Sequence, residues 1–421
     1  MTGHEDEDER LERLHFATVL KAFDDYLPYC LSANDTRRRS YFSLPMAHQQ
    51  LLSDLGAPLP LPALEASSST SSSPPEPWRG FKSRLDEIDD RIRRNAGLLS
   101  AIADESRGFL GPEPLASNGS SPHDASTSGA DDASNGGKGL RKRRKIPGHE
   151  IEKIQSTLKQ FVRDWSVEGL PERSAVYTPM IEAVTGLYGD SDKRSQVRIL
   201  VPGAGLGRLA FEYASLGYTC QGNEFSFYML LASHFILNKT THVGQHAIYP
   251  FVHSSSNWRT ADDMLRAIRI PDVLPSRLPP TSEFSMVAGE FCEVYSQPHE
   301  AKAWQVVATC FFIDTAKNVV RYLETINHLL PVGGHWINAG PLLWHFENAS
   351  RSTPTPDNLS IELTLDELVQ LLPKMGFELE QRRPLPPTPY TGMLNGMLQY
   401  HYSPEFFVCR KVRDVPAAPA V

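Results

Sequence analysis

The sequence predicts an α/β protein built on an open, mostly parallel sheet, and three observations carry this prediction. Residues 197–201 are apolar and rich in β-branched side chains, which is typical of a buried strand. A Gly-x-Gly-x-Gly turn ends this strand, and an apolar stretch at helical spacing follows over 209–216. Three later strand patterns end at a carboxylate, and ligands of open α/β sheets bind beyond such strand ends. These carboxylates belong to Glu224, Glu290 and Asp314.

The spacing of the glycines narrows the choice of nucleotide. A dinucleotide fingerprint, Gly-x-Gly-x-x-Gly/Ala, needs a small residue at its sixth position, because helix and strand pack closely there. Counted from Gly203, that position is Arg208, which is too large. Glycines at 203, 205 and 207 are instead usual for S-adenosylmethionine (SAM) methyltransferases. The loop alone leaves a plain tight turn or another nucleotide open.

The next two strands strengthen the methyltransferase interpretation. A short second strand at 217–224 ends in Glu224, roughly 20 residues past the loop, where a carboxylate can accept hydrogen bonds from ribose hydroxyls. A third strand at 284–288 leads to Glu290, where SAM enzymes often contact the adenine amino group. A solvated charge at the strand end is the plainer explanation of Glu224 taken by itself.

The remaining elements complete the predicted sheet. An almost wholly apolar run at 304–313 predicts the fourth strand, which ends at Asp314. Helical spacing over 319–330 then leads through a Pro-x-Gly-Gly turn into a fifth strand, the usual order in a SAM methyltransferase. Further elements are expected at the C-terminal end: a helix at 360–372 and strands beginning near 376 and 406. We therefore predict a Rossmann-like, seven-stranded class I SAM-dependent methyltransferase domain with an N-terminal helical accessory region.

Composition divides the chain into four parts. In chain order they are a helical accessory region (1–110) with a Ser/Pro-rich linker (56–77), a low-complexity insert ending in a basic run (111–148), the methyltransferase domain (149–412) and a flexible tail (413–421). Helical spacing places the accessory helices at 11–27, 46–55 and 81–102. The basic run at 141–145 is either a nuclear import or phosphate-binding signal or a solvated charge run.

The overall composition excludes several classes of protein. A net charge of -8 over 421 residues argues against a generally basic nucleic-acid surface. The five cysteines are scattered without a Cys-x-x-Cys pair, which indicates free thiols in a reducing compartment and no metal site. The N-terminus lacks the apolar core of a signal peptide, and no apolar run is long enough to span a membrane. We expect a cytoplasmic or nuclear protein.

A helix expected over 150–165 carries the next candidate residues. Its apolar stripe packs on the core, while Gln160 and Arg163, three residues apart, share another face. Arg163 could pair with the methionine carboxylate of SAM as a charge-assisted fork. An ordinary surface arginine is the plainer alternative. The sequence also leaves open whether the N-terminal helices form a homodimer interface or cover the cofactor.

With these residues assembled, the chain resembles the carnosine N-methyltransferase family over most of residues 150–412. The resemblance is carried by five long and unusual stretches. They are STLKQFVRDWS at 156–166, VPGAGLGRLA at 201–210, CQGNE at 220–224, TCFFIDTA at 309–316 and GPLLWHFE at 340–347. The resemblance is looser in the helical N-terminal region, and the low-complexity inserts have no counterpart.

The resemblance assigns two sets of site residues. SAM is expected to contact Gln160, Arg163, Gly203, Glu224, Glu290, Phe291 and Cys310, to which the loop spacing adds Gly205. The family usually has Asp where Glu290 stands, so the adenine contact here uses a longer arm. The dipeptide is expected to be held by Asp314, His345 and Tyr402, with Tyr400 as a nearby second candidate.

The implied reaction is methylation of the imidazole Nδ1 of histidine in carnosine or a related peptide, which gives an anserine-type product. Asp314 would accept the hydrogen on the other ring nitrogen, which fixes the tautomer and stabilises the cationic product. His345 and Tyr402 would orient the substrate. Histidine within proteins or other peptides remains an alternative substrate, and a silent SAM-binding interaction protein is an alternative class. A dinucleotide oxidoreductase is disfavoured by Arg208 and the Pro-x-Gly-Gly turn.

Overall fold

The computed structural model describes residues 2–53, 55, 80–108, 146–347, 359–390 and 395–415 of the chain. The Ser/Pro-rich linker expected at 56–77 and the basic run at 141–145 lie outside these residues, as does the insert expected at 111–148 except for its last three positions. Of the tail expected at 413–421, only 413–415 are described. There the Arg413 side chain donates to the carbonyls of Pro373 and Lys374, and the Val415 amide donates to Asn327.

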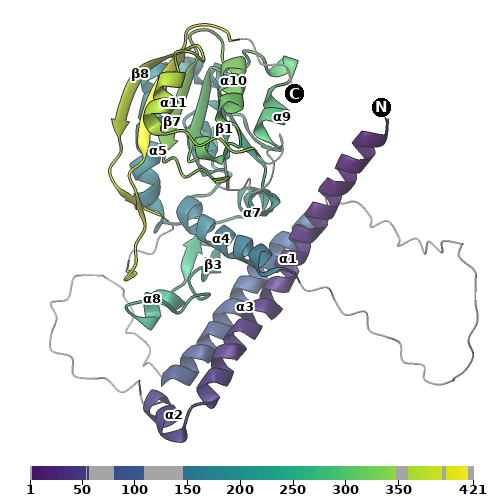
Figure 1. Cartoon of the computed structure of the whole chain (residues 1–421), viewed down its shortest axis with the longest axis vertical. Coiled ribbons are helices and arrows are strands. Elements are labelled where there is room, and N and C mark those ends of the chain that lie inside the picture. Colours follow the sequence, from purple (N-terminus) through teal and green to yellow (C-terminus); the bar gives the residue numbers. More distant parts are fainter. Residues whose placement is uncertain are drawn as a thin grey trace, which may run out of the picture.

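A seven-stranded sheet forms the centre of the molecule (Figure 1). Its strands, in spatial order, are β5 (Phe284–Ala288), β2 (Thr219–Glu224), β1 (Arg198–Pro202), β6 (Val306–Cys310), β7 (His335–Gly340), β11 (Glu405–Lys411) and β8 (Phe377–Pro384). The first five run parallel, and β11 is antiparallel to both of its neighbours. Strand order reverses between β1 and β6, which is where open α/β sheets bind their ligands. The predicted fold class is confirmed.

Helices cover both faces of the sheet. On one face, α5 (Leu170–Leu187) and α6 (Arg208–Ser215) pack on β1 and its neighbours. On the other face lie α9 (Phe291–Tyr295), α10 (Val319–Leu329) and α11 (Leu365–Leu371). The burial of apolar side chains on both faces explains the nearly continuous apolar runs of the central strands.

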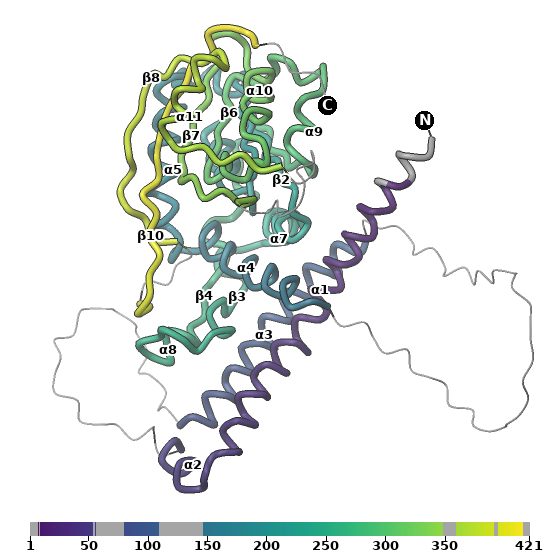
Figure 2. The backbone as a smooth tube through the Cα atoms, viewed as in Figure 1, coloured from purple at the N-terminus to yellow at the C-terminus, as the bar shows by residue number. Residues whose placement is uncertain are grey.

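The N-terminal helices form a separate arm. The two long helices α1 (Thr2–Phe42) and α3 (Gly80–Arg107) lie side by side, and α2 (Met46–Ser53) contacts α3 at one end of the pair (Figures 1 and 2). They share a core with α4 (Gly148–Trp165) and α7 (Phe227–Asn238). The accessory helices are therefore present as predicted, and the first is longer than the stretch expected at 11–27.

A buried polar network joins this arm to the sheet domain. The Tyr26 hydroxyl lies 2.7 Å from His253 Nε2, and the Asn95 side-chain amide donates to the Tyr26 hydroxyl (3.1 Å) and to the Tyr249 carbonyl (2.8 Å). The contacting segment 249–253 belongs to an insertion that the sequence did not reveal. It contains the antiparallel pair β3 (His246–Ile248) and β4 (Ile268–Ile270), with α8 (Ala261–Leu265) between them.

Two elements near the sheet end differ from the sequence prediction. The fourth strand, expected over 304–313, ends at Cys310 because Phe311 adopts a left-handed backbone (φ 52°) and a single helical turn, η4 (Ile313–Thr315), follows. The helix expected at 360–372 begins only after Thr364, which forms a capping box with Glu367. Four further short elements are η2 (Ser191–Gln196), η3 (Pro298–Glu300) and the antiparallel pair β9 (Thr388–Pro389) and β10 (His401–Tyr402). Within the described residues no helix is both long and apolar enough to cross a membrane.

Candidate active site

The glycine loop between β1 and α6 forms the floor of the candidate site. Gly203, Gly205 and Gly207 all have positive φ angles, of 64°, 57° and 80°. A Cβ atom on Gly205 would lie 3.2 Å from the Gln160 side-chain nitrogen and 3.5 Å from Asp164 Oδ2. Glycine is therefore needed at 205 for two reasons: the left-handed backbone and the close approach of α4.

Glu224, at the end of β2, is held by backbone amides. Its carboxylate accepts hydrogen bonds from the amides of Gly205 (2.8 Å), Phe225 (2.9 Å) and Ser226 (2.8 Å). Burial raises the pKa of this carboxyl, and the three amides oppose that rise. The same carboxylate thus connects the glycine loop to the start of α7 and remains on the wall of the cavity.

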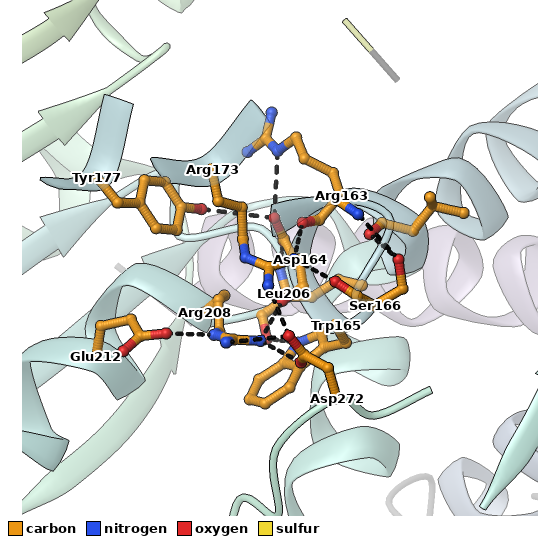
Figure 3. A network of polar contacts seen from close by, with 12 residues as sticks. Arg163, Asp164, Trp165, Ser166, Arg173, Tyr177, Leu206, Arg208, Glu212 and Asp272 are labelled. Carbon is orange, nitrogen blue, oxygen red and sulfur yellow. Dashed lines mark hydrogen bonds and ion pairs between the residues drawn. The ribbon is translucent and has the colours of Figure 1, made fainter. Parts of the chain in front are cut away.

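The last turns of α4 bring Gln160 and Arg163 to the same cavity. Between them lies the carboxylate of Asp164, which is 1% exposed and accepts from Gln160 Nε2 at 2.9 Å. It also accepts from Arg163 Nε at 3.2 Å (Figure 3). The Leu206 amide of the glycine loop also donates to this carboxylate, at 3.3 Å. Hydrogen bonds to the buried Asp164 carboxylate therefore hold helix α4 and the glycine loop together.

Arg208, the residue that disfavoured a dinucleotide loop, has a structural role beneath the site. The residue is 5% exposed, and its guanidinium forms ion pairs with Asp272 (2.5 Å) and Glu212 (2.7 Å) (Figure 3). Arg173 pairs with the same Asp272 carboxylate at 2.6 Å. Arg208 also donates to the backbone carbonyl of Asp164 at 2.7 Å, which holds α4 against the start of α6.

Asp314 has one carboxylate oxygen in use and, among the described residues, one without a hydrogen-bond partner. Its Oδ2 accepts from the Leu343 amide at 2.8 Å, and its backbone carbonyl accepts from the His345 amide at 3.0 Å. Its Oδ1 is buried and has no hydrogen-bond partner in the part of the chain that the structure describes. Burial raises the pKa of this carboxyl, opposed by the Leu343 amide and by the charge of His345. An orphaned buried oxygen of this kind is costly unless a ligand satisfies it.

Three aromatic rings stand next to Asp314. Phe311 lies 5.7 Å from Tyr402 and 6.2 Å from Tyr390, and the two tyrosine rings are 5.2 Å apart. The Arg163 guanidinium is 6.0 Å from the Phe311 ring. The left-handed backbone of Phe311 turns the chain immediately after β6, and backbone outliers of this kind cluster at functional sites.

These parts enclose one open cavity at the carboxyl ends of the parallel strands. It is lined by Gln160, Arg163, Gly203, Gly205, Glu224, Met229, Cys310, Phe311, Asp314, Pro341, Leu343, His345, Tyr390 and Tyr402. The structure thus brings together nine of the twelve residues that the sequence nominated. Burial raises the pKa of Cys310 to about 12, so its thiol stays protonated and is a poor nucleophile.

Three nominated residues do not line this cavity. Glu290 caps α9, where its carboxylate accepts from the Glu293 amide at 2.8 Å. Phe291 is buried among aromatic rings, with Phe312 at 5.3 Å. Tyr400 is 69% exposed. It lies just before β10, whose two residues pair with β9.

The sequence reasoning missed several lining residues. Phe311 and Leu343 lie in the stretches 309–316 and 340–347 that carry the family resemblance, close to nominated residues. Their position just after a strand could have nominated them. Tyr390 is different, because it follows a proline-rich segment without periodicity and reaches the site only through the β9–β10 pair. No pattern in the sequence predicts that pairing.

The chemistry of the cavity fits SAM. A carboxylate at the end of β2 suits the ribose hydroxyls, and an arginine with an amide suits the amino-acid end. Among the described residues there is no group of three or more His, Cys, Asp or Glu side chains that could hold a metal ion.

Comparisons with known proteins agree with this reading. A family model described as Carnosine N-methyltransferase matches residues 141–413. The Carnosine N-methyltransferase of Schizosaccharomyces pombe is 48% identical over 62% of this chain and 71% of its own length. That of Mus musculus is 38% identical over 97% of this chain and 89% of its own length.

Among solved structures, a SAM dependent methyltransferase from Aquifex aeolicus aligns with 61% of this chain and 98% of its own, at 11% identity and a TM-score of 0.35. The family match and the full-length relative carry the assignment, with the strand order of the sheet agreeing. The chain belongs to the carnosine N-methyltransferase family and is a SAM-dependent N-methyltransferase.

Proposed function

We propose that this enzyme methylates the imidazole Nδ1 of histidine in carnosine or a closely related small peptide. Its relatives are named for carnosine, which supports the substrate class. The observation that carries the proposed chemistry is the orphaned Oδ1 of Asp314 on the wall of the cofactor cavity. A neutral imidazole has a hydrogen on one ring nitrogen and a lone pair on the other, so a carboxylate that accepts the hydrogen selects the nucleophile.

The cofactor side of the cavity would hold SAM through five nominated residues. Arg163 and Gln160, which line the cavity, would bind the amino-acid end, and the Glu224 carboxylate would accept from the ribose hydroxyls. Gly203 and Gly205 let the loop backbone approach the ligand. When bound, SAM supplies a methyl group on a sulfonium centre, which is already a strong donor. The enzyme therefore needs mainly to align donor and acceptor.

Asp314 is the residue assigned to the acceptor. Its Oδ1 would accept the Nε2–H of the substrate imidazole, which leaves the lone pair on Nδ1. The carboxylate also stabilises the positive charge that develops on the ring as the new N–C bond forms. A strong base is not required, because an imidazole with a pKa near 6.5 is largely neutral at physiological pH.

The remaining peptide contacts are assigned to His345 and Tyr402. Neither side chain has a hydrogen-bond partner among the described residues, and both line the cavity. Phe311 and Tyr390 add aromatic faces beside Tyr402, and aromatic faces attract a cationic ring. We therefore extend the nominated peptide site by these two residues.

We also propose a cytoplasmic or nuclear location for this activity. All five cysteines are free thiols, and three of them are buried, which suits a reducing compartment. The sequence also left open a homodimer formed through the N-terminal helices. These helices extend away from the sheet (Figure 1), and the mass of the protein in solution would test this interface.

The test is methyl transfer from labelled SAM to carnosine by the purified full-length protein. The expected product co-elutes with authentic anserine and fragments as the Nδ1-methyl isomer. Anserine itself is the matched control acceptor, because its Nδ1 is already methylated and it should accept no label. A product methylated at Nε2, or transfer to anserine, would contradict the role given to Asp314. Binding of SAM without transfer to carnosine would move the substrate to other histidine peptides or proteins.

A further inference from the structure

The buried acid Asp164 belongs to none of the residues assigned to cofactor or peptide, yet it contacts two of them directly. Its Oδ2 accepts from Gln160 Nε2 at 2.9 Å and its Oδ1 from Arg163 Nε at 3.2 Å. Figure 3 shows Arg163 reaching back to this carboxylate from the same helix. Because Asp164 is 1% exposed, it meets these residues from behind the wall of the cavity.

The contact with Gln160 fixes which way its amide points. A carboxylate only accepts hydrogen bonds, so it selects the NH₂ group of the amide and not the carbonyl oxygen. The carbonyl oxygen of Gln160 has no hydrogen-bond partner among the described residues. Gln160, which lines the cavity, consequently has its carbonyl oxygen free to accept from a ligand.

The contact with Arg163 has the complementary effect. Its Nε–H is used by Asp164, and neither terminal Nη group has a hydrogen-bond partner in the described parts of the chain. The guanidinium lines the cavity, where its two Nη groups form a donor pair that matches a carboxylate. One buried acid thus presents an acceptor and a donor pair on adjacent turns of α4.

The amino-acid end of SAM carries an ammonium group and a carboxylate on one carbon, which require an acceptor and a donor pair. We propose that Asp164 is a positioning residue that orients Gln160 toward the ammonium and Arg163 toward the carboxylate of the cofactor. This inference rests on the proposed cofactor roles of Gln160 and Arg163 and is independent of the methyl acceptor.

The glycine loop also donates a hydrogen bond to Asp164, so one carboxylate contacts both helix α4 and the loop. The Leu206 amide donates to Asp164 Oδ2 at 3.3 Å, and Gly205 leaves room for Gln160 and Asp164 to lie against the loop. The Tyr177 hydroxyl lies 3.5 Å from Oδ1 on the other side. Asp164 therefore sets the α4 residues in register with the loop that would carry the rest of the cofactor.

The test compares two ligands that differ only in the amino-acid part. S-adenosylhomocysteine has both charged groups, whereas 5′-methylthioadenosine keeps the adenosine and lacks them. Calorimetric titration of the Asp164→Asn protein should show S-adenosylhomocysteine binding weakened by about tenfold or more, since hydrogen bonds to charged groups are lost. Binding of methylthioadenosine should stay within about twofold of wild type, a margin that represents only ~0.4 kcal/mol.

A matched control and a second variant complete the experiment. Glu212→Gln breaks the Arg208 ion pair in the same network without touching the cavity, and should leave both ligands unaffected. Gln160→Glu cannot donate to Asp164 and places a like charge beside it, so S-adenosylhomocysteine should bind more weakly. If Asp164 had no orienting role, the added carboxylate at 160 would instead attract the ligand ammonium and binding would hold or improve.

The outcomes separate cleanly. Equal losses for both ligands in Asp164→Asn, or no loss for S-adenosylhomocysteine, would overturn the orienting role. Should Asp164→Asn fail to fold, the direction of the Gln160→Glu effect alone decides. Failure of the proposed substrate would show separately, as wild-type protein that binds S-adenosylhomocysteine and does not methylate carnosine.

Discussion

The cavity has a cofactor half, formed by Gln160, Arg163, Gly203, Gly205 and Glu224, and a peptide half, formed by Phe311, Asp314, His345, Tyr390 and Tyr402. The two halves differ in how their polar groups are hydrogen-bonded. In the cofactor half, the Glu224 carboxylate already accepts three backbone amides and Asp164 accepts from Gln160, Arg163 and the loop. In the peptide half, Asp314 Oδ1 and the Tyr402 side chain have no hydrogen-bond partner among the described residues. In the cofactor half the protein itself holds Gln160, Arg163 and Glu224 in place and leaves only the Gln160 carbonyl and the Arg163 Nη groups without a partner among the described residues. In the peptide half it is an oxygen of the reacting carboxylate, Asp314 Oδ1, that is kept for a ligand.

This difference assigns different consequences to mutation. A change in the cofactor half removes groups that hold one another, so it should weaken cofactor binding. A change in the peptide half removes atoms that have no partner in the described structure, such as Asp314 Oδ1, so it should reduce turnover and leave the empty protein intact. Buried polar groups without partners cost stability, and such costs persist at sites that serve function. The predictions below test whether the two halves separate in this way.

The largest expected effect is on turnover in Asp314→Asn. We expect kcat to fall by about 10²- to 10⁴-fold, the range of a positioned acid or base, because the amide cannot accept from the imidazole as a carboxylate does. Binding of S-adenosylhomocysteine should be unchanged. Since burial raises the pKa of Asp314, its charged form is disfavoured in the folded protein and the neutral Asn should not lower the melting temperature.

Rate assays, calorimetry and thermal melts on one preparation would test this prediction. A drop in melting temperature together with loss of cofactor binding would make Asp314 a folding or cofactor residue, and the separation of the two halves would fail. In the thermal melts, His345→Ala is the comparison variant, because the His345 side chain is exposed and carries no hydrogen bond in the described structure.

In the cofactor half, Glu224→Gln should raise the dissociation constant of S-adenosylhomocysteine by about 10- to 100-fold. The side-chain amide cannot accept from three backbone amides and ribose hydroxyls together, and hydrogen bonds to a charged acceptor contribute about 1.5–3 kcal/mol each. KM for the peptide, measured at saturating SAM, should change little. A variant that keeps its cofactor affinity but loses peptide affinity would reverse the assignment of the halves.

A third prediction concerns the arm on which the cofactor half is built, because α1 and α3 pack against α4 and α7. Burial lowers the pKa of His253 to about 4, so its ring is neutral in the folded protein and can accept from Tyr26. In the unfolded chain the same ring binds a proton below its ordinary pKa of about 6.5. Stability should therefore fall as the pH drops through the window from about 6.5 to about 4.

Urea unfolding at pH 7 and pH 5 measures this effect, which should reach at most about 2 kcal/mol from His253. His253→Gln, which does not titrate, should lose that part of the acid sensitivity and keep the rest. An identical pH dependence in variant and wild type would mean that the Tyr26–His253 contact does not control the docking of the arm.

The two halves also differ in how far the sequence could predict them. The glycines at 203–207 and Glu224 lie in one continuous stretch, where strand, turn and strand end follow from local pattern. Gln160 and Arg163 were nominated by helical spacing and by family resemblance, but Asp164 was not, because its role depends on a loop amide from another element. Likewise, nothing local to Arg208 reveals Asp272, its partner from an insertion.

The peptide half was harder to predict because three distant segments assemble it. Phe311 and Asp314 follow β6, His345 follows β7, and the tyrosines come from the β9–β10 pair. Strands of two residues carry no period, and turn geometry decides which of several nearby tyrosines faces the cavity. This is why Tyr400 was nominated and is exposed, while Tyr390 was missed and lines the cavity.

The smallest predicted effect tests that missed residue. Tyr390→Ala removes two ring contacts, at 5.2 Å to Tyr402 and 6.2 Å to Phe311, and such pairs contribute about 0.5–1.5 kcal/mol each. We expect KM for the peptide to rise by about two- to tenfold with cofactor affinity unchanged, whereas Tyr390→Phe should keep nearly wild-type KM because it keeps the ring. Tyr400→Ala is the matched control, since that ring is exposed outside the cavity and its loss should change neither constant. If Tyr400→Ala raised KM and Tyr390→Ala did not, the peptide half would lie on the other side of the β9–β10 pair, and the contrast between the two halves would need to be redrawn.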